Sequence, residues 1–404
     1  MSAQDQTRQG TTVFRLPIWQ VPIWSAGFRP FFLAGAIYGP LAMVLWLLAH
    51  LGVAQTIPNP FADIQWHGHE LLVGYGTAVV CGFVITGIPS WAETRAIEGP
   101  ALAFLFATWL LGRAAMWLAA ILPGPIVAAA DLAFFPVLAV LITPSLLDAR
   151  KKRYMAILPI LAGFFYGNLL FHAGAMLDDQ KITTFGLMFF LYTLIVLYSL
   201  VGGFLTPIFT EGALHERGWK GFIRFHRGIE TLAILSVLAF AGTGLYAESG
   251  LVRGMAALAA LVIHGLRMAR WRSLRVGQIP LVWVMHASYA WFLASLALRA
   301  LYDFLGWAPS MAWLHAFTVG AFGLMKIGFL TRVTLRHTGR PPQPNVAMVI
   351  GFGLMVLAAL ARLFAAFGIG GAALMGASSI LWALPFVIYL WLYGAMLIRP
   401  SLPG

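Results

Sequence analysis

About twelve apolar runs, each long enough to cross a bilayer, follow one another along almost the whole chain. A helix needs ~20 apolar residues to span ~30 Å of hydrocarbon. The 404 residues are 60% hydrophobic and only 10% charged, a composition that excludes an ordinary soluble domain. The sequence therefore predicts an all-α polytopic membrane protein with about twelve transmembrane helices.

Glycine, proline and charged residues separate the apolar runs and so predict the helix boundaries. Residues 1–27 are expected to form a cytoplasmic N-terminal segment without a cleavable signal peptide, and residues 28–400 a single helical transmembrane domain. The predicted helices are 28–51, 65–91, 99–121, 124–147, 154–177, 183–209, 226–247, 250–271, 279–303, 309–336, 344–367 and 374–398.

The net charge of +12 comes largely from basic residues in particular connections between the predicted helices, and this distribution argues against nucleic-acid binding. Arg and Lys concentrate in four alternate connections, 150–153, 217–227, 270–275 and 332–340. In the intervening connections acidic residues outnumber basic ones: Asp63, Asp178, Asp179, Glu248 and Asp303 stand against only Lys181 and Arg253. Because cytoplasmic loops of membrane proteins carry the excess of Lys and Arg, the basic connections and both termini are predicted to be cytoplasmic.

The motif Trp66-His67-Gly68-His69-Glu70 opens one of the apolar runs. Its two imidazoles and its carboxylate are costly to desolvate. A membrane protein therefore contains such groups mainly where they line a transport pathway, transfer a proton or bind a metal. Neutral imidazole suits copper, haem iron and zinc, and Glu70 is placed to ligate beside His67 or to fix its tautomer. His67 and His69 point to different faces of a regular helix, so they need not share a metal. The alternative is that both anchor the helix among lipid headgroups.

The histidines sort into two sets by expected depth in the membrane. His315 and His337 are ~33 Å apart along one helix, so they cannot ligate the same metal. The outer set is His67, His69, His172 and His315; the inner set is His226, His264 and His286, with His337 as a further candidate. Imidazoles projecting from several helices are how bundles build haem and metal sites. Hydrogen bonding between helices is the alternative role for His264 and His286.

Four other features of the sequence lead to predictions. Arg29 is expected either to reach lipid phosphates or to grip a cofactor carboxylate such as a haem propionate. Arg113 and Asp131 lie on consecutive helices and can pair. Segment 202–207 is expected to bend or break its helix. Lys326 is a mid-helix charge for which Glu230 is a candidate partner.

Cys81 is the only cysteine, so the chain has no internal disulfide and no cysteine-ligated iron–sulfur cluster. A covalent C-x-x-C-H haem attachment is excluded for the same reason. Any haem is therefore expected to be bound non-covalently, as a b-type haem.

Several motifs together resemble the NnrS family over most of the chain: FRPFF at 28–32, WHGHE at 66–70, GFVITGIPSW at 82–91, LHAFTVG at 314–320 and TRVTLRHTGR at 331–340. The resemblance implies a bacterial inner-membrane protein that contains haem and copper and is associated with denitrification and relief of nitric oxide stress. The chain departs from the family pattern at Gly68, Phe204 and Lys326, which leaves the proposed ligands intact.

Three functions follow as hypotheses. In the first, the protein handles nitric oxide or a nitrosyl species by redox chemistry at a buried metal, with an electron donor that the sequence does not identify. In the second, it transports a metal or a nitrosyl–iron species. In the third, it is a haem-based sensor without turnover. The outer set is expected to supply a second metal centre, with Glu70 as a ligand or an outer-shell partner of a ligand.

Overall fold

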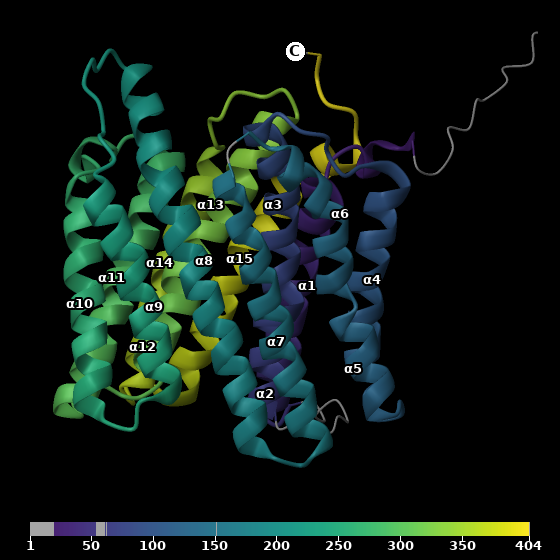
Figure 1. The fold of residues 1–404 in the computed structure, drawn as a ribbon, viewed down its shortest axis with the longest axis vertical. Coiled ribbons are helices and arrows are strands. Elements are labelled where there is room, and N and C mark those ends of the chain that lie inside the picture. Colours follow the sequence, from purple (N-terminus) through teal and green to yellow (C-terminus); the bar gives the residue numbers. More distant parts are fainter. Residues whose placement is uncertain (1–19, 54–60, 62, 151, 404) are drawn as a thin grey trace, which may run out of the picture.

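The computed structural model describes residues 20–53, 61, 63–150 and 152–403, and is helical with no strand among them. Twelve of its helical spans are long and apolar enough to cross a membrane. They stand side by side in one bundle (Figure 1), and many large apolar side chains, such as Leu258 and Trp391, face outward. This confirms the predicted all-α polytopic architecture.

The spans follow the predicted order with boundaries within a few residues. In the first half they are α1 (Phe28–His50), α2–η3–α3 (Asp63–His69, Glu70–Gly76, Thr77–Ala92), α4 (Gly99–Trp117), α5–α6 (Gly124–Leu132, Phe134–Asp148), η4–α7 (Lys152–Ala156, Ile157–Met176) and α8 (Gln180–His215). In the second half they are α9 (Arg227–Tyr246), α10 (Gly250–Ala269), α11 (Pro280–Leu305), α12–η6–α13 (Ala312–His315, Ala316–Ala321, Phe322–His337), α14 (Val346–Ala366) and α15 (Gly371–Ile398). The short 3₁₀ segments η2 (Pro22–Trp24) and η5 (Ser273–Arg275) lie outside the spans.

The start of α1 and the end of α15 lie at the same end of the bundle (Figure 1), here called the terminal end. Arg29 is buried and joins them. Its Nη1 donates to the carbonyl oxygens of Met396 (3.0 Å), Leu397 (3.0 Å) and Arg399 (2.7 Å), and its Nη2 donates to Ser401 Oγ (2.9 Å). The last carbonyls of a helix have no intrahelical partner, so Arg29 caps α15. The cytoplasmic position of this end stays a prediction.

Two spans contain a π-helical segment, and each segment begins directly after a histidine of the outer set. η3 follows His69, and η6 follows His315. A π segment rotates the residues before it relative to those after it, and such segments occur frequently at functional sites. These two segments were not predicted from the sequence.

Of the bend or break expected at 202–207, the break is wrong, and a bend stays a prediction. α8 continues as one helix through Pro207 to His215 and rises above its neighbours at the terminal end (Figure 1). Gly203 serves a different purpose, because a Cβ there would collide with the guanidinium of Arg267 on α10. The glycine lets Arg267 Nη1 donate to the carbonyl of Ser199 at 2.9 Å.

Candidate functional site

A buried polar cluster lies near the end of the bundle opposite the termini, here called the far end. Four consecutive spans supply its side chains, and each of these side chains is almost completely buried. The members of this cluster, the His–Asp cluster, are His69, Glu70, Arg113, Asp131, Asn168 and His172.

Arg113 holds the two carboxylates of the cluster. Its Nη1 donates to both oxygens of Glu70 (2.7 and 2.8 Å), and its Nη2 donates to Asp131 Oδ1. The Arg113–Asp131 pair expected from the short connection between the two helices is thereby confirmed. Tyr38 on α1 donates to Glu70 and receives a hydrogen bond from Trp117 Nε1 at 2.8 Å. The tyrosine was not foreseen, because no local motif links α1 to the cluster.

His69 lies between the carboxylates. Its Nδ1 is 2.8 Å from Glu70 Oε1, and its Nε2 is 3.1 Å from Asp131 Oδ2 and 2.9 Å from Asn168 Oδ1. Carboxylate and amide oxygens accept, so both ring nitrogens act as donors and we assign His69 as an imidazolium. Two cations, Arg113 and His69, then balance two carboxylates, and the cluster is electrically neutral.

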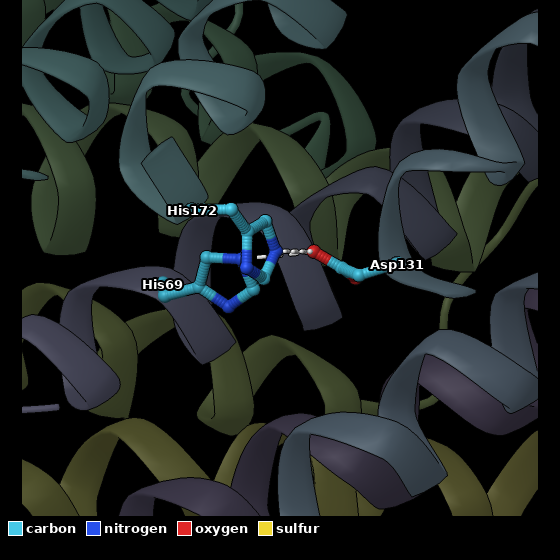
Figure 2. Close-up of side chains that lie close together, drawn as sticks. All are labelled: His69, Asp131 and His172. Carbon is cyan, nitrogen blue, oxygen red and sulfur yellow. Dashed lines mark hydrogen bonds and ion pairs between the residues drawn. The ribbon is translucent and has the colours of Figure 1, made fainter. Parts of the chain in front are cut away.

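His172 completes the cluster from α7 and makes it a candidate metal site. Its Nε2 lies 2.9 Å from Asp131 Oδ2 (Figure 2). One ligand atom from each of His69, Asp131 and His172 lies within 4.8 Å of the others, and no other such group occurs among the described residues. A metal bound here would replace the hydrogens that the two imidazoles now direct at Asp131, because only a deprotonated ring nitrogen ligates.

His67 and His315 lie elsewhere, on the wall of a cavity of about 340 Å³ called here the far cavity. His67 stacks near Trp46, with ring centroids 3.9 Å apart, and its buried Nδ1 has no hydrogen-bond partner among the described residues. His315 Nδ1 donates to the carbonyl of Met311 at 2.9 Å. This bond fixes the neutral tautomer whose Nε2 carries a lone pair, the form that ligates metals. The structure thus divides the outer set into two pairs.

The histidines of the inner set do not form a comparable cluster among the described residues. His226 is exposed at the start of α9, and His337 is exposed beside Phe28, with ring centroids 5.7 Å apart. His264 is fully buried. Its Nε2 donates to the carbonyl of Ala233 at 3.2 Å, and its Nδ1 lies 2.6 Å from the hydroxyl of Tyr289.

Both nitrogens of His286 are also engaged. Thr210 Oγ1 gives its hydrogen to a backbone carbonyl, so the Nε2 of His286 donates to it at 2.8 Å, and Nδ1 accepts from Ser273 Oγ at 2.8 Å. These contacts match the hydrogen-bonding alternative. Ligation of haem or metal by the inner set, like a cofactor contact of Arg29, stays a prediction.

Glu230 is not the partner of Lys326. Glu230 pairs with Arg267, whose Nε lies 3.2 Å from Glu230 Oε1. The Lys326 ammonium instead lies 3.7 Å from the ring centroid of Tyr75 and 3.9 Å from that of Phe322. The neighbours of Lys326 depend on which helix face packs against its own helix, and the sequence does not reveal which faces meet.

Two further cavities continue from the far cavity toward the terminal end. A middle cavity of about 50 Å³ shares Phe322 and Lys326 with the far cavity. A third cavity of about 580 Å³ shares Phe83, Val84 and Leu197 with the middle one and reaches the Glu230–Arg267 pair. The three cavities therefore follow one another through the bundle, with the smallest in the middle.

Comparison with known proteins identifies one family. The family model described as NnrS protein matches residues 22–401 of this chain. None of the curated proteins matches. The matched range includes every histidine of the outer and inner sets.

Proposed function

Because the chain belongs to the NnrS family, we propose that it is a bacterial inner-membrane protein that binds haem and copper and handles nitric oxide or a nitrosyl species. The observation that carries this proposal is the pair His67 and His315, two half-buried imidazoles that line one cavity and present ring nitrogens without partners among the described residues. Membership of the family supports the link to nitric oxide.

The two pairs of the outer set fit different groups. The far cavity offers about 340 Å³ with mostly apolar walls, which suits an organic group such as haem, and its two imidazoles are the residues that would hold the iron. The His–Asp cluster has three ligand atoms close together and a carboxylate, which suits a bare ion such as copper. A haem held in the far cavity would supply a redox-active iron to which a diatomic gas can bind.

The chain's own residues do the rest. Met311 fixes the tautomer of His315, and Trp46 holds the ring of His67. Arg113 and Glu70 orient His69 and Asp131. Tyr38 anchors Glu70 in turn, so it is a positioning residue for the cluster. These contacts limit the reorganisation that ligand binding requires.

Single alanine substitutions at His67, His69, His172 and His315 test the proposal, with haem and copper per protein measured by absorption and metal analysis. We expect His67→Ala and His315→Ala to lose haem while keeping copper, and His69→Ala and His172→Ala to lose copper while keeping haem. His215→Ala, an exposed histidine outside these sites, is the matched control. If all four variants keep the wild-type content of both, the sites are not those proposed.

A second function, transport of a metal or a nitrosyl–iron species, is supported by the succession of three cavities. The middle cavity would have to widen, since about 50 Å³ holds little more than a diatomic molecule or water. Flux into vesicles that contain the purified protein distinguishes the two. Uptake by a preparation free of haem and copper favours transport over nitric oxide chemistry.

A further inference from the structure

The wall of the far cavity carries positive charge without a counter-charge. Lys326 lies near the middle of its span and is only 5% exposed, and Arg362 on α14 reaches the same cavity. No aspartate or glutamate among the described residues lines the cavity. Neither cation forms an ion pair with any carboxylate of the described residues. The contacts of Lys326 to two aromatic rings leave its charge uncompensated.

An uncompensated cation is costly inside a membrane protein, and such residues mark sites for ions or ligands. The neutral donors around the cavity are weaker than these two cations, although the Tyr75 hydroxyl and the Trp46 indole N–H among them have no partner among the described residues. Thr318, Ser378 and Ser379 give their hydrogens to backbone carbonyls at 2.8 to 3.1 Å. The two cations are therefore the strongest hydrogen-bond donors that face the cavity.

We propose that the far cavity binds an anionic group, a carboxylate or a small oxyanion, and that Lys326 and Arg362 hold it. Lys326 is buried and Arg362 is half-buried. Both can supply charge-assisted hydrogen bonds in a medium of low dielectric, where an anion gains most from them.

Two sources have the required chemistry. One is a free inorganic anion that enters the cavity. The other is the pair of carboxylates that a haem carries, which matches the two cations in number; this source rests on the proposed function. Both place negative charge beside Lys326 and Arg362.

The experiment compares the purified full-length wild type with Lys326→Gln and Arg362→Gln. Arg336→Gln, which removes an exposed cation from the same helix as Lys326, is the matched control. The first measurement is the unfolding temperature during titration with sodium nitrate, a poor ligand for iron and copper. The ionic strength is kept constant with sodium chloride, whose anion is neither a carboxylate nor an oxyanion. The second is haem per protein after purification.

If a free anion binds, nitrate raises the unfolding temperature of the wild type saturably, and each cavity variant weakens nitrate binding about tenfold or more. If haem carboxylates bind, nitrate has little effect and each cavity variant loses about half or more of its haem. Arg336→Gln matches the wild type in both cases. The proposal is overturned if nitrate has no effect and haem content is the same in all variants.

Folding and the proposed function are controlled separately. Removing a buried cation without a partner relieves a desolvation cost, so Lys326→Gln is expected to fold. Lys326→Arg keeps the charge and is expected to retain binding, and Arg362→Gln is an independent test. A wild type without haem and copper would refute the proposed function, whereas saturable nitrate binding by that same preparation would still support the anion site.

Discussion

The buried charges of the His–Asp cluster are matched one for one. Arg113 and His69 face Glu70 and Asp131, and each carboxylate touches both cations. Asp131 Oδ2 also accepts from Asn168 Nδ2 at 2.7 Å. A buried pair of this kind contributes little net stability compared with apolar residues, but removing one partner leaves a charge exposed to low dielectric. The cluster therefore behaves as a unit.

Arg113→Met is expected to destabilise the protein by about 3–5 kcal/mol, since both carboxylates lose a partner. Thermal unfolding in detergent measures this as a lower midpoint. Arg224→Met, which removes an exposed cation, should leave the midpoint nearly unchanged. Equal midpoints for the two variants would contradict the role of Arg113 in the cluster.

Gly203→Ala tests the close approach of Arg267 to α8. Its Cβ would collide with the guanidinium, so Arg267 would have to leave Ser199 and Glu230. We expect a loss of about 1–3 kcal/mol from the disturbed buried cation. Gly212→Ala on the same helix meets no atom within 4 Å and should be neutral or stabilising. Thermal unfolding of both variants distinguishes the effect of the collision with Arg267 from the effect of alanine on helix propensity.

Among the elements, α7 and α8 pack closely because glycines face each other across their interface. A Cβ on Gly186 would meet the backbone of Phe171 and Gly167, which cannot move aside as a side chain can. Small residues let helix backbones approach in membranes. This approach places Asn168 and His172 against Asp131. The packing of two helices thus positions part of the candidate metal site.

Gly186→Val is expected to push α7 away from α8 and so to lower copper content, because His172 would move from Asp131. Haem content should change less, since neither His67 nor His315 lies on α7. Metal analysis measures both. Gly242→Val on α9, where a Cβ meets nothing within 4 Å, controls for the added side chain. If Gly186→Val keeps the wild-type copper content, the packing of α7 against α8 does not position the candidate metal site.

In the whole molecule, an even number of spans returns the chain to the end at which it starts. The basic connections and the cap that Arg29 forms on α15 both belong to the terminal end. The far end holds the His–Asp cluster and the far cavity. The bundle therefore separates its candidate metal sites from its basic face.

The orientation of the bundle is tested by cysteine labelling in a Cys81→Ala background. Lys220→Cys lies between α8 and α9 at the terminal end, and Glu248→Cys lies between α9 and α10 at the far end. If the terminal end is cytoplasmic, an impermeant maleimide labels Glu248→Cys in spheroplasts and Lys220→Cys only after lysis. The reverse pattern would place the termini on the outside.

The sequence by itself determined the architecture and the residue types of the sites. Hydrocarbon thickness fixes span length, so apolar runs predict the spans, and an imidazole within such a run already indicates a ligand or a buried hydrogen bond. The pairing of Arg113 with Asp131 was also predictable, because a short connection makes α4 and α5 neighbours.

Only the tertiary structure decided which residues act together. His67 and His69 are two positions apart in the sequence, yet one faces the far cavity and the other Asp131. Lys326 meets Tyr75 and not Glu230, and Gly203 admits Arg267 and does not break α8. The physical reason is that helix rotation and close approach are set by packing between spans, and the hydrophobic pattern of a span buried on most sides does not specify either.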